Sequence, residues 1–507
     1  MLRQVTLCIV VLSAISSIVL LHAQRSEDRG EVLAKQYCQS CHVQPLPEHL
    51  DKSTWISKVF PVMRTYMGLD LPAGRDQMSH DLAAMYPTVP MMTEDEWFAI
   101  ASWYIEKAPA KLPTPPALQY RGTSPMFQSL RMPAEQPAPM TSVVQFDTIH
   151  RCIVVGDAQT HMLRVLDLNG REIRRIDVGG PPSCLVIKGN TWYVTNMGKL
   201  LPHDSAVGSV AQIAWSGSPI AGASTYKMST LIDTLRRPTS LVVDDINQDG
   251  RLDFLVTEYG NLLGRFGWFE SLKSGAFTYH ELAAQPGAIR AIVKDVTNDK
   301  RPDIIVVMAQ AREVVRIYEN NGKGRFSSHD VIESPPSFGS SSVSLADVDG
   351  DRVDEILLTT GDNGDYQSPP YKPYHGVYVY KRSKPLVYAL ATFDPFDGAY
   401  GAIARDFDRN GKMDLLSFSY FPNLHGQDID LVRISHDNIK NDQGVWSVGD
   451  AQSGRWLVSD AADVDGDGDV DVILGNVSIG PGAVTDKQAE IWMSSGYSAL
   501  FLRNTNR

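Results

Sequence analysis

The chain shows two patterns of apolar and polar positions, one before residue 110 and another after residue 118. In the first region, the apolar residues from Trp97 to Tyr104 recur at the spacing of one helix face. Thr93 and Glu96 form a capping-box pattern that opens this helix. The stretch from Gly30 to Tyr37 is also compatible with a short helix. We therefore predict a small all-α unit that begins and ends with a helix.

Beyond residue 118, the apolar residues form short runs that follow acidic loops. Five such loops begin at positions 245, 295, 347, 406 and 463, so their starts lie 50, 52, 59 and 57 residues apart. Each loop precedes an apolar run such as Ile304–Val307, which predicts a strand rather than a helix. A repeat of this length with several short strands has the size of a β-propeller blade.

Two further units without an acidic loop precede these five. Ser142 to Val178 and Pro181 to about Arg237 each hold several strand-like runs, which brings the predicted total to seven blades. We expect a strand within residues 119–131 to complete the last blade, because this hides the edge strands of the ring. The sequence thus predicts a multidomain chain: an all-α unit at 27–108, a Pro-rich linker at 109–118, and an all-β propeller at 119–507.

The acidic loops have the composition of calcium sites. Each offers side-chain oxygens at positions 1, 5 and 9 and a side chain with an oxygen at position 3, which suits a hard cation. A glycine at position 6 permits the turn in three loops, whereas Lys300 and Arg352 replace it in the other two. The predicted ligands, for up to five calcium ions, are Asp245, Asn247, Asp249, Asp253, Asp295, Asp299, Asp303, Asp347, Asp349, Asp351, Glu355, Asp406, Asp408, Asn410, Asp414, Asp463, Asp465, Asp467 and Asp471.

Loops of this composition have two other interpretations. An EF-hand would need a bidentate glutamate at position 12, where the loops carry Val256, Val306, Leu358, Ser417 and Leu474. That interpretation fails, and strands follow the loops instead of helices. The other alternative is that the aspartates cap turns through Asx hydrogen bonds without metal. The five copies resemble the FG-GAP/VCBS repeat family over residues from about 235 to 480, which implies a β-propeller of the integrin α-subunit type with calcium-binding loops.

Residues 38 to 42 carry a second chemical motif. Cys38 and Cys41 with His42 form the attachment pattern of one c-type haem, in which two thiols bond to the porphyrin and the imidazole ligates the iron. The order of parts resembles a class I cytochrome c over roughly 80 residues, which implies crossing terminal helices and a methionine as second axial ligand. In that family the methionine usually precedes the last helix. The candidates, in order of preference, are Met91 or Met92, then Met63, then another ligand such as His49 or His80.

The N-terminus predicts export. An apolar run from Val5 to Leu21 follows Arg3 and precedes a polar stretch, as in a signal peptide at residues 1–23, with an uncleaved membrane anchor as the alternative. We therefore expect a periplasmic or cell-surface protein that touches a membrane only through this segment. In such an oxidising compartment, Cys152 and Cys184 could form a disulfide or remain buried thiols.

Charge narrows the range of partners. The chain has 47 Lys+Arg against 59 Asp+Glu, a net charge of −12, and no basic cluster, which disfavours nucleic acid. Five calcium ions would offset about 10 of these charges. Neither a G-x-S-x-G nor an H-E-x-x-H pattern is present, so no hydrolase motif is found.

Three functions fit these features. The first is an exported electron-transfer protein with one haem c, in which the propeller docks a redox partner or binds a ligand. The second is a haem-linked dehydrogenase of a small organic substrate, so enzymatic activity is left open. The third is a calcium-dependent adhesion or matrix-binding module. Turns after each post-loop strand should gather on one face of the ring and could bind a sugar or peptide, with residues 362–375 as the preferred segment. They carry Asn196, Glu258, Tyr259, Asn261, Gln310, Asp362, Asn363, Tyr420, Asn423 and Asn476.

Overall fold

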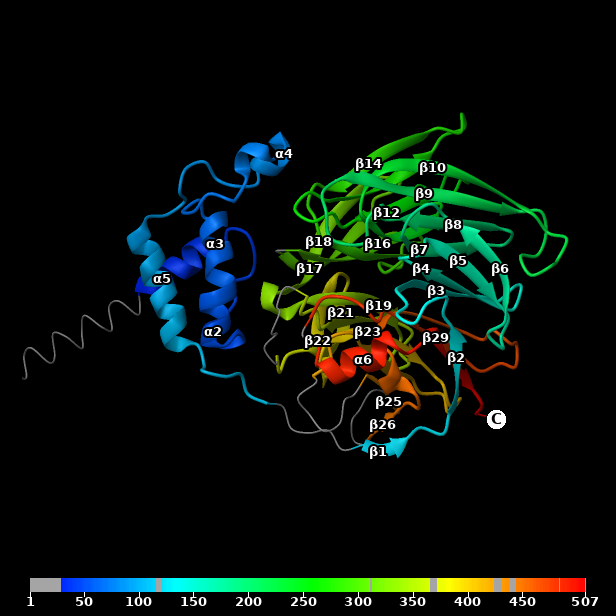
Figure 1. Cartoon of the computed structure of the whole chain (residues 1–507). Coiled ribbons are helices and arrows are strands. Elements are labelled where there is room, and N and C mark those ends of the chain that lie inside the picture. Colours follow the sequence, from blue (N-terminus) through cyan, green and yellow to red (C-terminus); the bar gives the residue numbers. More distant parts are fainter. Residues whose placement is uncertain are drawn as a thin grey trace, which may run out of the picture. The chain divides into compact units, whose positions relative to one another are not determined.

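The chain divides into two compact units, Met1–Pro113 and Thr114–Arg507, and each is described by itself. The computed structural model describes residues 29–114, 120–310, 312–364, 372–423, 431–436, 444–482 and 484–506 (Figure 1). The predicted signal segment at 1–23 and part of the predicted linker lie outside these ranges. In the part of the chain that is described, no helix is both long and apolar enough to cross a bilayer.

The first unit is all α-helical, as predicted. A helix at 29–38 begins it, and α5 (Glu94–Lys107) ends it. Thr93 and Glu96 form the predicted capping box of α5, since each side chain accepts a hydrogen bond from the other residue's backbone N–H. Between them lie η1 (Pro47–His49), α2 (Lys52–Thr54), the π-helical turn η2 (Trp55–Val59), α3 (Phe60–Tyr66), η3 (Arg75–Gln77) and α4 (His80–Ala83).

The first and last helices of this unit pack closely against each other. At Gly30, an added Cβ would lie 2.5 Å from the Ala99 carbonyl oxygen and 2.5 Å from Trp103 Cβ, so only glycine allows this approach. The Tyr37 hydroxyl donates to Glu96 at 3.2 Å. Buried aromatic and aliphatic side chains complete the core beneath the two helices: Leu33, Leu50, Trp55, Met67, Met92, Trp97, Ile100, Trp103 and Tyr104.

The second unit is a seven-bladed β-propeller, as predicted. Its sheets are β3 (Thr141–Asp147), β4 (Cys152–Asp157), β5 (Met162–Leu166), β6 (Glu172–Asp177); β7 (Pro182–Lys188), β8 (Thr191–Asn196), β9 (Ala206–Trp215), β10 (Tyr226–Arg236); β11 (Pro238–Asp244), β12 (Asp253–Glu258), β13 (Arg265–Ser271), β14 (Phe277–Ala283); and β15 (Ala288–Lys294), β16 (Asp303–Gln310), β17 (Arg312–Asn320), β18 (Phe326–Ser334).

The remaining three blades complete the ring. They comprise β19 (Ser340–Ala346), β20 (Glu355–Thr360), β21 (Gly376–Lys384), β22 (Val387–Pro395); β23 (Ala399–Arg405), β24 (Asp414–Ser419), β25 (Val432–Ser435), β26 (Val445–Ser447), β1 (Tyr120–Thr123); and β27 (Trp456–Ala462), β28 (Asp471–Asn476), β29 (Tyr497–Asn504), β2 (Phe127–Pro133). Short helices η4 (Pro336–Phe338), η6 (Ala451–Ser453) and α6 (Asp486–Met493) lie between strands.

Two strands from the start of the propeller close the ring. β2 pairs antiparallel with β29 and becomes the outermost strand of the last blade, with Phe127 opposite Asn504. This confirms the expected closure, although the strand runs to Pro133 rather than ending at residue 131. β1 instead adds in parallel to β26 of the preceding blade, a contact that the sequence pattern does not reveal.

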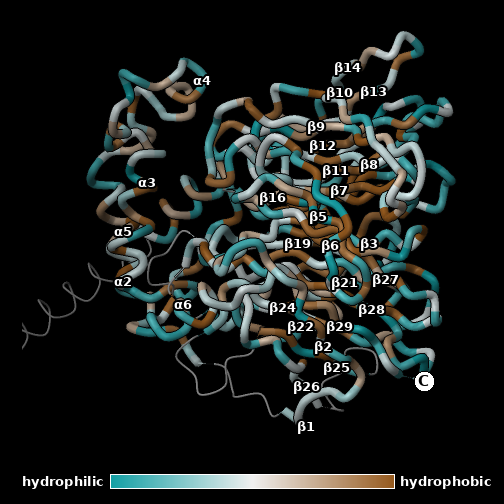
Figure 2. The backbone as a smooth tube through the Cα atoms, turned by 45° about the vertical axis from the view of Figure 1, so that its right-hand side comes forward, coloured by the Kyte–Doolittle hydropathy of each residue, from teal (hydrophilic) through white to brown (hydrophobic). Residues whose placement is uncertain are grey.

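Apolar faces hold neighbouring blades together. The first strand of every blade contacts the first strand of the next, so these seven strands form the inner ring. Buried side chains join adjacent blades, as where Trp268 and Met308 share one cluster. Figure 2 shows the hydrophobic colour concentrated on inner strands such as β3, β27 and β28. Turns between first and second strands therefore lie at one end of the ring, and turns between second and third strands at the other.

Candidate functional site

Each acidic loop connects the first and second strands of its blade. Its ninth residue is the first residue of the second strand and is at most 2% exposed: Asp253, Asp303, Glu355, Asp414 and Asp471. In every loop this carboxylate accepts a hydrogen bond from the backbone N–H of the second residue, at 2.8 to 3.4 Å. The ninth residue therefore holds the loop onto its blade.

The five loops also share one backbone conformation. The fourth and sixth residues have positive φ in every copy: Gln248 and Gly250, Asn298 and Lys300, Gly350 and Arg352, Arg409 and Gly411, Gly466 and Gly468. The sixth N–H donates to the carboxylate of the first residue at 2.8 to 3.0 Å. Lys300 (φ 68°) and Arg352 (φ 69°) thus keep the turn without glycine, at a cost in backbone strain.

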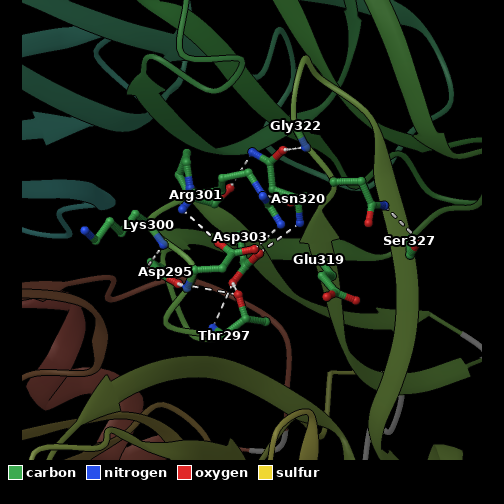
Figure 3. Close-up of polar contacts among 12 residues, drawn as sticks. Asp295, Thr297, Lys300, Arg301, Asp303, Glu319, Asn320, Gly322 and Ser327 are labelled. Carbon is green, nitrogen blue, oxygen red and sulfur yellow. Dashed lines mark hydrogen bonds and ion pairs between the residues drawn. The ribbon is translucent and has the colours of Figure 1, made fainter.

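In the loop that begins at Asp295, the protein's own donors satisfy the carboxylates (Figure 3). One oxygen of Asp303 accepts from the backbone N–H groups of Val296 and Thr297 and from the Thr297 hydroxyl, at 3.0 to 3.1 Å. The other oxygen accepts from the Asn320 N–H at 2.9 Å. Asp299 forms an ion pair with Arg301. This arrangement is that of a self-contained turn.

The loop that begins at Asp463 differs. The carboxylates of Asp463, Asp465 and Asp467 each place an oxygen within 4.8 Å of the others. Oδ1 of Asp465 and Oδ1 of Asp469 are buried, and neither has a hydrogen-bond partner among the described residues. Burial, together with the neighbouring carboxylates, raises the pKa of Asp469 to about 6 and that of Asp471 to about 7. Arg409 lies 3.8 Å from Asp469 and Arg503 lies 3.9 Å from Asp465, so protein donors satisfy the concentrated negative charge of this loop only in part.

The other three loops fall between these two cases. Asp347, Asp349 and Asp351 also cluster within 4.8 Å, and the Lys381 ammonium lies against the latter two, 3.0 Å from Asp351. Oε1 of Glu355, in the same loop, is buried without a hydrogen-bond partner in the described chain.

The remaining two loops have mixed contacts. Asp249 pairs with Arg251 in the loop that begins at Asp245. In the loop that begins at Asp406, Asp408 and Asp414 cluster with His436, whose Nδ1 lies 3.1 Å from Asp414.

The predicted haem motif begins at the end of the first helix. Cys38 is the last residue of the helix at 29–38, Cys41 is exposed, and both are free thiols. Burial raises the pKa of Cys38 to about 11. His42 Nδ1 lies 2.9 Å from the Val43 carbonyl oxygen, so Nδ1 donates and Nε2 carries the lone pair. Burial lowers the pKa of His42, which favours the neutral, ligating form.

The candidate axial methionines have different surroundings. Met92 is 5% exposed within the helical core, Met91 is 44% exposed, and Met63 packs against the core from its edge. The Met91 N–H donates to the Met67 carbonyl at 2.9 Å, which holds the segment before α5 against the end of α3. His49 Nδ1 accepts from the Leu46 N–H, and His80 is almost fully exposed beside Asp81.

At the opposite end of the propeller, several predicted face residues hold strand ends in place. Asn476 is buried and donates to the carbonyl of Tyr497, and Asn196 donates to Val178. Glu258 is 1% exposed and pairs with Arg265 at 2.6 Å. The Asn261 N–H donates to Asp204, whereas Asn363 leaves a buried Oδ1 without a partner in the described chain. Of the preferred segment 362–375, residues 365–371 lie outside the described ranges, and Asn423 lies at the edge of another gap.

Other predicted residues of this end contribute to an aromatic and charged cluster. The Tyr259 hydroxyl donates to Gln310 at 2.8 Å. Tyr420 packs beside Tyr400, with ring centroids 5.4 Å apart, and under the guanidinium of Arg455 at 3.9 Å.

Sequence reasoning missed Tyr400, Arg455 and Arg237. The last of these lies over the Tyr259 ring at 5.2 Å. All three lie at the start of an innermost strand rather than in the turns after the post-loop strands. Their positions just before or within β11, β23 and β27 could have been found by aligning the blades.

Of the two alternatives for the propeller cysteines, a disulfide or free thiols, the structure has the free thiols. Both are free thiols, Cys152 in β4 of the first blade and Cys184 in β7 of the second. They pack in different apolar clusters, and Cys184 lies against the Leu241 carbonyl at 3.8 Å. Topology keeps the two thiols apart, because adjacent blades turn these two side chains toward different interfaces.

A comparison with known protein families agrees with the repeat that the acidic loops define. Residues 245–306 and 295–358 match the family described as FG-GAP-like repeat. This segment consists of FG-GAP repeats. The match begins after β11 of the third blade, covers the fourth blade and reaches into the fifth, and so includes the loops that begin at Asp245, Asp295 and Asp347. The FG-GAP repeats and the seven-bladed ring together fit a ligand-binding or docking module. No curated protein matches the chain significantly.

The solved structures that match this chain are distant from it in sequence. The N-terminal domain of Nup159 is 11% identical with a TM-score of 0.43, and the match covers 76% of this chain and 99% of that one. The Pan2 WD40 domain of Neurospora crassa is 12% identical with a TM-score of 0.45, covering 77% and 96%. The extracellular domain of the putative hybrid two component system BT4673 from B. thetaiotaomicron is 13% identical with a TM-score of 0.43, covering 75% and 40%.

Proposed function

We propose that this protein is an exported c-type cytochrome that transfers electrons through one haem and uses its propeller to dock a redox partner or bind a ligand. The observation that carries the proposal is the Cys38–His42 motif at the end of a helix that packs against the last helix of the same small unit. Cys38 and Cys41 would hold the porphyrin through two thioether bonds, and His42 Nε2 would ligate the iron. Bound haem would supply a one-electron redox couple.

The surroundings of His42 support this role. Its Nδ1 contact with the Val43 carbonyl fixes the tautomer that leaves Nε2 as the ligand atom. The lowered pKa of His42 removes competition from a proton at neutral pH. The exposed Cys41 thiol is accessible for covalent attachment. These residues are what a c-type site requires from the protein, and they favour a cytochrome over a redox-active cysteine pair.

The test is a reduced-minus-oxidised visible spectrum of the full chain, produced with the haem-attachment machinery. We expect a c-type spectrum with a methionine-to-iron charge-transfer band. The Cys41→Ala variant should retain at most one thioether, which shifts the haem band to longer wavelength, whereas Cys152→Ala in the propeller should leave the spectrum unchanged. Among Met91→Ala, Met92→Ala and Met63→Ala, the variant that loses the charge-transfer band identifies the axial ligand. Absence of any haem band from the wild-type protein would refute the proposal.

We further propose that the acidic loops bind calcium, with the loop that begins at Asp463 as the best site. Its clustered carboxylates and buried partnerless oxygens are the features that a hard cation would satisfy. The loop that begins at Asp295 has the weakest case, because its own donors already satisfy Asp303. A cage of protein oxygens leaves no open position for a substrate, so these ions would be structural.

A further inference from the structure

The five blades with acidic loops differ in charge at one position of the third strand. In the fifth blade Ile356 pairs with Tyr380, so the next residue of β21, Lys381, stands opposite Glu355, the ninth residue of the loop. The strand registers of the other four blades place Glu270, Glu319, His436 and Arg503 at the equivalent position. The charge beside the loop therefore changes from blade to blade, although the loop itself repeats.

In the fifth blade this residue contacts two loop carboxylates at once. The Lys381 ammonium lies 3.0 Å from Asp351 and also forms an ion pair with Asp349. Asp347, Asp349 and Asp351 each place an oxygen within 4.8 Å of the others. The ammonium therefore binds two of the three carboxylates that a calcium ion in this loop would need.

The loops of the third and fourth blades obtain a cation in a different way. In the third blade Arg251, the seventh residue of the loop, pairs with Asp249, and the fourth-blade loop has the same pair at its equivalent positions. The seventh residue of the fifth-blade loop is Val353, which has no charge. Lys381 thus supplies from the third strand the cation that this loop lacks.

The seventh-blade loop has no cation at comparable distance. Its seventh residue is Asp469, which adds a carboxylate instead of a guanidinium. In the described chain, its ion pairs are those of Arg409 with Asp469 at 3.8 Å and of Arg503 with Asp465 at 3.9 Å. Both distances exceed that of a hydrogen bond, so these carboxylates are more open to a free ion than those beside Lys381.

One oxygen of the fifth-blade loop still lacks a partner. Glu355 is 2% exposed, and its Oε1 makes no hydrogen bond with any described residue. Lys381 pairs with the two more exposed carboxylates but not with this buried one. A calcium ion takes six to eight oxygens and would be able to use Glu355 together with the aspartates. The loop therefore keeps the ligands of a calcium site while a protein cation covers part of them.

We propose that Lys381 is a built-in competitor of calcium in the fifth-blade loop. Calcium must displace the ammonium before it can bind, so this loop binds the ion more weakly than the loop that begins at Asp463 does. The inference rests on the proposed calcium role of the loops, because it names the residue that sets the affinity of one of them. It does not depend on the haem.

The test compares Lys381→Met with the wild type in the full chain, after removal of bound metal with EDTA. Methionine keeps an unbranched side chain without the charge, and Lys381 is half-exposed, so the change leaves the core intact. Lys384→Met is the matched control, because Lys384 lies on the same strand, is exposed and forms no ion pair with another described residue. Isothermal titration calorimetry with calcium chloride then gives the number of sites and their affinities.

We expect Lys381→Met to bind calcium in the fifth-blade loop about tenfold more tightly than the wild type, because two ion pairs no longer have to be broken. Lys384→Met should bind calcium as the wild type does. Adding Asp351→Asn to Lys381→Met should abolish the gain, which assigns it to this loop. With EDTA present, Lys381→Met should melt at a lower temperature than Lys384→Met, since the clustered carboxylates have lost their counter-charge, and calcium should restore the difference.

The outcomes separate this inference from the calcium proposal on which it rests. If Lys381→Met binds calcium no better than the wild type, while Asp465→Asn still weakens binding, the inference is overturned and the calcium proposal stands. If no variant binds calcium, both are overturned. If Lys381→Met gains a site that the wild type lacks, the inference is supported even where the wild-type loops bind little calcium. Equal melting of Lys381→Met and Lys384→Met in EDTA would also overturn it, because Lys381 would then not act as a counter-ion.

Discussion

The two ends of the propeller differ in how their buried charged groups are arranged. At the acidic-loop end, the same backbone turn and the same ninth-residue carboxylate recur in five blades, and most of these carboxylates accept backbone hydrogen bonds through both oxygens. At the other end, Glu313, Arg237 and Arg455 each occur in particular blades, and none of them forms an ion pair with another described residue. A charged group that recurs in every acidic loop indicates a role in building each blade. A charged group found in one blade only indicates a role specific to this chain.

The largest predicted effect tests the repeated end. Replacing Asp303 by Ala should lower the free energy of unfolding by about 3 to 5 kcal/mol, because four buried or half-buried donors lose their acceptor. Urea unfolding with and without calcium measures this, and the loss should be the same in both. Asp299→Ala, in the same loop, should cost under about 1 kcal/mol because Asp299 pairs only with partly exposed groups. A loss at Asp303 that appears only with calcium would contradict the self-contained turn.

The second prediction concerns calcium itself. Calcium should raise the stability of the protein by about 3 kcal/mol at a hundredfold excess over its dissociation constant, and chelation should reverse this. Asp465→Asn and Asp467→Asn should remove most of the increase, since both belong to the clustered loop. Asp299→Asn should leave it nearly unchanged. Thermal melts at several calcium concentrations measure the increase in stability for each variant. Equal effects of all three variants would mean that the loops do not differ in calcium binding.

The third prediction tests the other end through pH. Burial raises the pKa of Glu313 to about 8, and the Ser340 N–H donates to it at 2.7 Å. The unfolded chain has the lower pKa, so the stabilising contribution of Glu313 is complete below about pH 4.5 and is lost as the pH rises through about 8.

Glu313→Gln should therefore be more stable than the wild type above pH 8, by about 1 to 2 kcal/mol, with a flatter stability profile. Glutamine keeps an acceptor for Ser340 but cannot ionise. Chemical unfolding from pH 5 to 9 measures the profile, with Glu490→Gln on α6 as a surface control. Identical slopes for the wild type and Glu313→Gln would show that the carboxyl group is not forced to stay neutral.

The sequence predicted the repeated features of this protein well. The spacing of the loops that begin at Asp245 and Asp463 located the blades, because each loop combines turn residues with a following apolar strand. The burial of Arg455 could not be predicted in this way. Aligning the blades places Arg237 and Arg455 just before an innermost strand, but nothing in the local sequence shows that the Arg455 side chain is buried against an aromatic ring.

The smallest predicted effect tests whether the shared turn carries strain where glycine is absent. Lys300 has φ 68°, a conformation that costs a non-glycine residue about 1 to 2 kcal/mol. A glycine at this position would remove that cost, but part of the gain in stability is offset because the unfolded chain of the glycine variant has greater entropy. Lys300→Gly should therefore stabilise the protein by about 0.5 to 1 kcal/mol.

The reverse change, from glycine to alanine, measures the free-energy cost of the backbone conformation alone. Gly250 has φ 88°, and an added Cβ would meet no atom within 4 Å, so Gly250→Ala should destabilise by about 1 kcal/mol without a steric clash. Gly222 is equally uncrowded but lacks a positive φ, which makes Gly222→Ala the control and predicts no loss. Urea unfolding resolves differences of this size when the three variants are measured together. If Lys300→Gly were neutral while Gly250→Ala was destabilising, the side chain of Lys300 would have to compensate for its backbone strain, and the five turns would not be equivalent.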